Sequence, residues 1–198
     1  TLDLMLLAGH AQRLSGAWSD SMNTFREAAA IAELARLPEA MAEAALGYEH
    51  PRYRYNLPAG TARDLLGRAL AALPVRDSSL RVRVLAGLAR ATATTSTGLS
   101  DAAVPMADEA IAMARRLDDP QALLEALEMR FLFDRAPSEI HRRLATMEEM
   151  LGLARRLSDK RLLLDILEMR YMDRMALGQR EAGDFIEEHA RLADELTD

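Results

Sequence analysis

One stretch of the sequence occurs twice, forty residues apart, and this duplication constrains the fold more than any other feature. Residues 114–131 read ARRLDDPQALLEALEMRF, and residues 154–171 read ARRLSDKRLLLDILEMRY, with eleven of eighteen positions identical. Self-similarity at a fixed period of this size indicates stacked repeats, because a single repeat cannot bury its own apolar face and needs a neighbour. Functional residues are therefore expected on an extended surface.

Each copy spans the end of one helix and the start of the next. The leading ARRL places arginines at the negative C-terminal end of a helix. Asp118-Asp119-Pro120 and Ser158-Asp159 then interrupt the helical pattern and offer N-caps for the following helix. The repeating unit is thus a helical hairpin, and about five hairpins would fill the 198 residues. We predict an all-α fold, a right-handed superhelical solenoid that forms a single repeat domain over residues 1–198.

Turn and capping residues divide the chain into ten predicted helices. Between the third and the fourth, the tyrosine- and proline-rich stretch from Gly47 to Pro58 predicts an irregular, non-helical insert near residues 48–60. The predicted N-caps, besides those of the duplicated stretch, are Ser19 or Asp20, Ser78 or Ser79, and Ser100-Asp101. The predicted helices cover residues 2–14, 20–35, 38–46, 61–73, 80–94, 101–117, 121–134, 138–157, 159–177 and 180–196.

Composition and charge disfavour several classes of function. Apolar residues make up 49% of the chain and aromatic residues only 5%, which is typical of closely packed helical hairpins. The net charge of −6 disfavours direct contact with nucleic acid. The chain has no cysteine, which fits a reducing cytoplasm. No apolar run approaches the roughly 18 residues of a membrane span. We therefore expect a cytoplasmic fragment of a longer protein, without membrane contact.

The first predicted hairpin resembles a tetratricopeptide repeat. Gly9, Phe25 and Ala28 stand at the spacings of that repeat's small, aromatic and alanine positions, where the small residue lets the second helix approach the first. The tryptophan and tyrosine that the pattern has in its first helix are absent. The repeat length near forty exceeds the tetratricopeptide length and overlaps HEAT-type arrays. The first hairpin favours the tetratricopeptide-like interpretation.

Longer segments resemble the tetratricopeptide-like region of large ATP-binding LuxR-type (STAND-like) bacterial transcriptional regulators. The segments are LARLPEAMAEAALGY, LLGRALAALPVRDSSLRVRVLAGLA, ADEAIAMARRLDDPQALLEAL and ARLADEL, which together sample most of the chain. In that family a nucleotide-binding module precedes the repeats and a helix-turn-helix domain often follows. No phosphate-binding loop lies in this sequence, since its one lysine, Lys160, follows Asp159. The resemblance implies a sensor or scaffold segment that controls assembly of the whole regulator.

Two ladders of opposite charge are expected along the repeats. The first consists of arginines in successive first helices, and its members are Arg90, Arg130 and Arg170. Such a ladder could bind carboxylates or phosphates bidentately. The second consists of glutamates in the second helices, and its members are Glu109, Glu149 and Glu188. We favour a structural role, in which the two ladders pair and staple the hairpins, because a partly buried guanidinium requires an acid partner.

The insert and the methionines offer two further candidate sites. The insert combines aromatic and cationic side chains, which are enriched at binding hot spots: Tyr48, His50, Arg52, Tyr53, Arg54 and Tyr55. The alternative, which we favour, is that the tyrosines fill the gap left by a short helix. Six methionines could line an adaptable groove, but at helical spacing they favour the core: Met129, Met147, Met150, Met169, Met172 and Met175.

The sequence offers no constellation for catalysis or metal binding. The four histidines are scattered, and adjacent acids such as Glu148-Glu149 point to different sides of a helix. We therefore predict a non-enzymatic regulatory domain without cofactor or metal, binding a protein partner or an effector. Two alternatives stay open: a protein–protein or self-association scaffold, with the chain as a homo-oligomer, and a receptor for an anionic small molecule or peptide in the concave groove.

Overall fold

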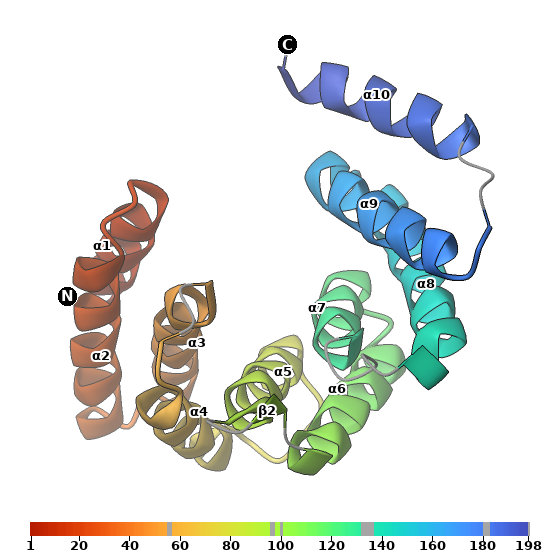
Figure 1. Ribbon diagram of the computed structural model, residues 1–198. Coiled ribbons are helices and arrows are strands. Elements are labelled where there is room, and N and C mark those ends of the chain that lie inside the picture. The colour runs from red at the N-terminus through yellow and green to blue at the C-terminus, as the bar shows by residue number, and fades with distance from the viewer. Residues whose placement is uncertain (55–56, 96–97, 100, 132–136, 180–182, 198) are drawn as a thin grey trace. The chain divides into compact units, whose positions relative to one another are not determined.

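The computed structural model describes residues 1–54, 57–95, 98–99, 101–131, 137–179 and 183–197. These residues form an all-helical fold (Figure 1), as predicted; the handedness of the solenoid stays a prediction. A two-residue antiparallel pairing, Thr94–Thr95 (β1) with Gly98–Leu99 (β2), follows the fifth helix, and short 3-10 turns cover Asp101–Ala103 (η1) and Pro137–Glu139 (η2). The helices are α1 (Leu2–Leu14), α2 (Trp18–Leu34), α3 (Pro38–Arg54), α4 (Gly60–Ala72), α5 (Ser79–Ala93), α6 (Val104–Leu117), α7 (Pro120–Phe131), α8 (Ile140–Leu157), α9 (Lys160–Ala176) and α10 (Gly183–Thr197).

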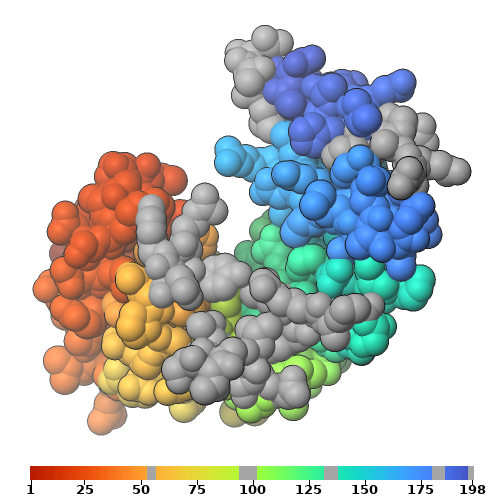
Figure 2. Space-filling model, viewed as in Figure 1, coloured from red at the N-terminus to blue at the C-terminus, as the bar shows by residue number. Residues whose placement is uncertain are grey.

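The chain divides into two compact units, Thr1–Met129 and Arg130–Asp198. In the first unit each helix from α1 to α6 packs against the next, and α3 also contacts both α1 and α5. In the second unit α9 packs against α8 and α10. Figure 2 shows the space-filling surface in the view of Figure 1. Sequential packing of this kind fits the predicted hairpins. One continuous array over residues 1–198 stays a prediction.

The duplicated stretch forms the same turn in both copies. Asp118 and Ser158 each adopt the left-handed conformation, with φ of 49° and 57°. The amide after each of them donates to the carbonyl of the alanine five residues earlier, at 3.2 and 3.0 Å. Arg36, between α2 and α3, repeats this turn with φ of 55°. Because non-glycine residues rarely adopt this conformation, its recurrence supports a common hairpin design.

Three of the predicted N-caps are confirmed. The Asp119 carboxylate accepts from the Ala122 amide and that of Asp159 from the Leu162 amide, both at 3.0 Å, while the hydroxyl of Ser78 accepts from the amide of Arg81 at 3.2 Å. The cap predicted for α2 is wrong, since that helix begins at Trp18 after Ala17 and has no side-chain cap. Ser19 and Asp20 instead lie in its first turn, where an acidic side chain suits the positive end of the helix. Of the Ser100-Asp101 pair, Ser100 lies outside the described residues, and Asp101 begins η1.

The predicted non-helical insert is wrong for residues 47–54, because α3 continues to Arg54. Gly47 admits the ring of Phe25, since a Cβ there would lie 2.4 Å from that ring. Pro51 lies inside the helix, where it costs one backbone hydrogen bond. Tyr48, only 8% exposed, adds buried area that offsets this cost. Residues 55 and 56 lie outside the described part of the chain.

Phe25 is the centre of the packing in the first hairpins. It is fully buried, and Gly9 of α1 and Gly47 of α3 both contact its ring. A Cβ on Gly9 would lie 2.8 Å from the ring, so a larger residue would push α1 away. Ala28, one turn further along α2, is also fully buried. Gly9 and Phe25 thus make the close contact between α1 and α2 that the tetratricopeptide-like pattern predicts.

The methionines divide between core and surface. Met129, Met147 and Met150 are at most 1% exposed, as the core interpretation predicts. Met172 and Met175 are 63% and 40% exposed and contradict it. These two stand near the C-terminal end of α9, where the core of the second unit does not cover them.

Candidate functional site

A cleft of about 400 Å³ lies in the first unit. It is lined by the first helix of each successive hairpin, that is by α1, α3, α5 and α7. Its lining is rich in ionisable side chains of both signs. These are His10, Arg13, Glu43, Glu49, His50, Arg83, Arg90, Glu125 and Glu128. Because every hairpin repeats the first-helix position, side chains about one repeat apart in sequence meet here. Its lining has more ionisable side chains than that of either of two other clefts in the described residues, at Glu33–Arg68 and at Arg143–Asp173.

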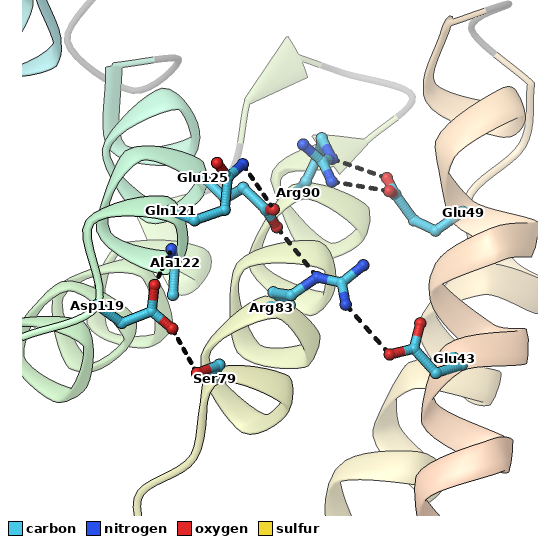
Figure 3. A network of polar contacts seen from close by, with 9 residues as sticks. All are labelled: Glu43, Glu49, Ser79, Arg83, Arg90, Asp119, Gln121, Ala122 and Glu125. Atoms are coloured by element: carbon cyan, nitrogen blue, oxygen red, sulfur yellow. Dashed lines mark hydrogen bonds and ion pairs between the residues drawn. The ribbon is translucent and has the colours of Figure 1, made fainter. Parts of the chain in front are cut away.

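The acidic triad, as we name Glu43, Arg83 and Glu125, joins α3, α5 and α7 (Figure 3). Nη1 of Arg83 donates to Glu43 at 3.1 Å, and its Nε lies 3.3 Å from Oε2 of Glu125. All three side chains are between 35% and 38% exposed. One guanidinium thus stands between two carboxylates, and the three groups together carry a formal charge of −1.

The basic triad consists of Arg52, Glu49 and Arg90 and joins α3 to α5. Nε and Nη2 of Arg90 donate to the two Glu49 oxygens, each at 2.9 Å (Figure 3). Nη2 of Arg52 donates to the same carboxylate at 3.2 Å, and its Nη1 donates to the carbonyl of Leu57 at 3.1 Å. Glu49 and Arg52 are 1% exposed and Arg90 is 21% exposed. Here two guanidinium groups share one carboxylate, and the formal charge is +1.

The two triads lie two helical turns apart. Arg83 and Arg90 occupy positions i and i+7 of α5, which puts them on the same side of that helix. At about 1.5 Å per residue their separation along the axis is about 10 Å. Each triad also bridges α3 and α5, since Glu43 reaches Arg83 and Glu49 reaches Arg90. The cleft therefore has an acidic level near the helix N-termini and a basic level toward their C-termini.

His10 adds an uncharged polar group to the cleft. Its ring meets the ring of Phe25 edge-on, with centroids 5.0 Å apart and an angle of 72° between the planes. Burial lowers the pKa of His10 below its ordinary value, and the nearby charges of Arg13 and Arg83 lower it further, against an opposing effect of Glu43. At neutral pH the imidazole is therefore a neutral hydrogen-bonding group.

The predicted arginine residues each lie on the expected first helix, but one of them is out of register. The caps of α5, α7 and α9 are Ser78, Asp119 and Asp159, so the second interval is one residue shorter than the first. Arg90 stands twelve residues after its cap, whereas Arg130 stands eleven residues after its own. The position of Arg90 on its helix therefore differs from that of Arg130 by about 100° around the helix axis. A ladder through Arg90, Arg130 and Arg170 stays a prediction, because the first belongs to the first unit and the other two to the second.

The acid partners of these arginines differ from those expected. Arg90 pairs with Glu49, and Arg170 pairs with Glu148 at 3.2 Å. Two of the predicted glutamates have other partners, since Glu109 pairs with Arg116 at 3.1 Å and Glu188 with Arg155 at 2.8 Å. Arg130 is partly buried at the end of α7, and Glu149 is partly buried in α8. The pairs observed for Arg90 and Arg170 are those of a structural role.

The residues of the predicted insert up to Arg54 belong to helix α3 and not to a loop. Tyr48 and Arg52 are buried in α3, and His50 is exposed there and lines the cleft. The side chains of Tyr53 and Arg54, at the end of α3, lie outside the described part of the structure, as does the whole of Tyr55. Among the described residues of the insert, Gly47, Glu49 and His50 line the cleft, and Arg52 pairs with Glu49 behind it.

Sequence reasoning missed Glu43, Glu49, Arg83 and Glu125. A signal for them was present, since Glu43 and Arg83, and likewise Glu49 and Arg90, are opposite charges about one repeat apart. Pairing opposite charges at the repeat spacing would have indicated both contacts. The repetition of like charges at that spacing predicted the ladders instead.

The second unit has a different cleft, of about 470 Å³. Met169 and Met172 line it together with Phe131, beside the ion pair of Arg143 with Asp173. Here the structure favours the alternative of a methionine-lined groove. Its ionisable groups are fewer than those of the first cleft.

The structure and the comparisons add three observations on function. Within the described residues, no group of three or more potential ligands is placed to hold a metal ion. No described helix combines the length and the apolar character needed to cross a membrane. No protein-family model matches the chain, and no curated protein matches it.

Proposed function

We propose that this chain is a non-catalytic interaction segment whose cleft on α1, α3, α5 and α7 binds a segment of a partner protein. The observation that carries the proposal is that Glu43, Arg83 and Glu125, together with Glu49 and Arg90, line one cleft of about 400 Å³. Side chains from four helices contribute to the lining, so a bound segment would contact several repeats at once. Such a contact couples the relative positions of the hairpins to binding.

The charge arrangement favours a peptide over a small anionic effector. Arg83 and Arg90 each have carboxylate partners within 3.3 Å, so an anion would compete with Glu43, Glu49 and Glu125 for them. A peptide supplies both signs of charge along an extended chain and can pair with groups of either triad. A receptor for a purely anionic molecule is therefore the weaker candidate for this cleft.

The wider role that we propose is the control of assembly in an ATP-dependent transcriptional regulator. The support is the resemblance of the Ala/Leu/Arg-rich segments to that family's repeat region. In the full-length protein, occupation of the cleft would shift the equilibrium between assembled and unassembled states by its differential affinity for the two. The readout is the oligomeric state of the full-length protein with ATP, compared between the natural sequence and Arg83→Glu.

Selection from a displayed library of random decapeptides tests the binding function directly. We expect enriched peptides that bind the purified chain in calorimetry and lose about tenfold or more in affinity on Arg83→Glu, with the melting temperature nearly unchanged. Absence of any enriched peptide, or binding indifferent to Arg83→Glu, would contradict the proposal. If light scattering shows a dimer and no peptide binds to it, the result would favour the self-association scaffold.

A further inference from the structure

The turn between α2 and α3 has the same backbone as the two duplicated turns but different side chains. Arg36 takes the left-handed position that Asp118 and Ser158 take in the other two turns. The amide after it, that of Leu37, donates to the carbonyl of Ala32 at 2.9 Å, as the corresponding amides do in the duplicated turns. The backbone of this turn therefore does not dictate its side chains.

Two exposed leucines distinguish this turn from the other two. The two arginines of each ARRL correspond here to Glu33 and Leu34, and the N-cap aspartate that follows corresponds to Leu37. Leu34 is 87% exposed and Leu37 is 47% exposed. A leucine cannot cap a helix, and its exposed part gains nothing from the hydrophobic effect, so folding alone does not explain leucine at position 37. Exposed apolar side chains that gather at one place indicate a contact with another molecule.

Leu37 lines a cleft of about 300 Å³ at this turn. The apolar part of the lining comes from α2, α3, α4 and the turn itself, and consists of Ala32, Leu37, Pro38, Met41 and Ala72. The cleft belongs to the first unit and shares no lining residue with the cleft of about 400 Å³. It is therefore a separate candidate site.

The charged groups of this cleft are one carboxylate and two guanidinium groups. Glu33 pairs with Arg68 at 2.6 Å, across α2 and α4. The guanidinium of Arg36 is exposed and has no hydrogen-bond or ion-pair partner among the described residues. A ligand that places an apolar side chain in the cleft can therefore pair a carboxylate with Arg36 without displacing an existing partner.

We propose, independently of the proposed function, that this cleft binds the C-terminal residue of a partner protein, with its apolar side chain against Met41 and its carboxylate on Arg36. Arg36 and Leu37 are adjacent, so the two groups of the ligand must also lie close together. Side chains of adjacent residues in an extended segment point in opposite directions, whereas the terminal carboxylate and the last side chain share one Cα. A volume of about 300 Å³ is at the lower end for a ligand site and suits one large side chain, not the several anchors of an amphipathic helix.

Methyl NMR of the purified chain, labelled at its methionine methyl groups, tests the proposal. Met41 is the reporter because it lines the cleft, and Met41→Leu assigns its resonance. The probe is an acetylated serine–glycine hexapeptide that ends in leucine with a free carboxylate. Matched hexapeptides end in leucinamide, in alanine with a free carboxylate, or in leucine followed by an amidated glutamate. At low ionic strength we expect a Kd on the order of 1 mM for the probe and about fivefold or more weaker binding of each matched peptide.

Two substitutions assign the two contacts. Arg36→Gln should remove the preference for the free carboxylate and leave the preference for leucine over alanine. Arg63→Gln is the matched control, because Arg63 is an exposed arginine of α4 outside the lining, and it should leave each Kd unchanged. Leu37→Asp should weaken the probe about fivefold or more while the melting temperature stays the same or rises, because aspartate can cap α3 as Asp119 and Asp159 cap α7 and α9.

Four results would each overturn this inference. Equal binding of the free and the amidated leucine peptide would mean that Arg36 takes no part. Tightest binding of the peptide with glutamate would mean that the cleft takes an internal acidic side chain. A Met41 resonance that no hexapeptide shifts at about 10 mM would mean that the cleft does not bind a chain terminus. A clearly lower melting temperature of Leu37→Asp would mean that Leu37 serves folding. The library selection tests the cleft of about 400 Å³ separately from all of these.

Discussion

The acidic and the basic triad are built from the same two residue types, yet they differ in composition and in burial. Glu43, Arg83 and Glu125 are all about a third exposed or more, whereas Glu49 and Arg52 are almost fully buried. An exposed ion pair contributes little to stability because water solvates its members nearly as well. A buried one is costly to break, because the remaining charge has no solvent. The difference teaches that the acidic triad can exchange partners, while the basic triad fixes α3 to α5.

Glu49→Gln should have the largest effect among the substitutions considered. It leaves the guanidinium of Arg52 buried without its carboxylate, and breaking a buried pair typically costs about 3–5 kcal/mol of unfolding free energy. Glu43→Gln is the matched change in the acidic triad and should cost less than about 1 kcal/mol. Urea unfolding followed by circular dichroism measures both. Equal losses in the two variants would mean that burial does not separate the triads.

Gly47→Ala should displace the part of α3 that carries Glu49 and Arg52, without changing a residue of the basic triad. The added Cβ would lie 2.4 Å from the Phe25 ring, so α3 must shift where it leads into Glu49 and Arg52. Steric overpacking of this kind costs about 1–3 kcal/mol. Gly67→Ala in α4 is the control, because nothing lies within 4 Å of its Cβ position.

Helix propensity should make Gly67→Ala neutral or stabilising by up to about 1 kcal/mol. Thermal unfolding of both variants provides the measurement. If Gly47→Ala were as stable as Gly67→Ala, the close contact of α3 with Phe25 would not be needed for the helix to continue past residue 47.

The features that could be predicted from sequence are those that depend on local chemistry. The break in the helix after ARRL and the caps at Asp119 and Asp159 follow from residues within one turn of each other. The continuation of α3 could not be predicted in this way. Gly47 and Pro51 disfavour helix locally, and the ring that makes Gly47 favourable belongs to Phe25 of another helix.

The two triads could not be predicted from sequence without knowing how successive hairpins stack. Their members pair across helices that are about one repeat apart in sequence, so each pair depends on the registration of successive hairpins. The step from the cap of α5 at Ser78 to that of α7 at Asp119 is one residue longer than the next step, to Asp159. This single residue separates Arg90 from Arg130 on the helical surface. A uniform period of forty hides that shift.

A substitution of Asp119 tests whether a second contact, besides the acidic triad, holds α5 and α7 together. Its carboxylate caps α7 and accepts from the hydroxyl of Ser79 on α5 (Figure 3). Asp119→Ala should cost about 1 kcal/mol, the typical value of an N-cap. Asp159→Ala removes the equivalent cap of α9 and is the matched control. A negligible loss for Asp119→Ala would mean that the α5–α7 contact rests on Arg83 and Glu125.

The same contact should depend on pH. Hydrogen bonds from the Ala122 amide and then the Ser79 hydroxyl lower the pKa of Asp119 below its ordinary value of 3.8. Because the folded pKa is the lower one, the carboxylate contributes stability above the ordinary value and loses it as the pH falls through the folded pKa. Asp119→Asn keeps a capping side chain without this titration. The difference between the two proteins in urea unfolding should shrink on acidification, and a constant difference would contradict the assignment.

The smallest expected effect is that of salt on the coupling free energy of an ion pair in each triad. A double-mutant cycle on Arg83 and Glu125 should give a coupling free energy below about 1 kcal/mol, because both side chains are more than a third exposed. At about 1 M salt the Debye length falls to roughly 3 Å, so this coupling should nearly vanish. A cycle on Arg90 and Glu49 should give a larger coupling that persists, because Glu49 is shielded from ions. If salt weakened both couplings equally, Glu49 would be open to solvent in solution, and the division between an exchangeable and a fixed triad would fail.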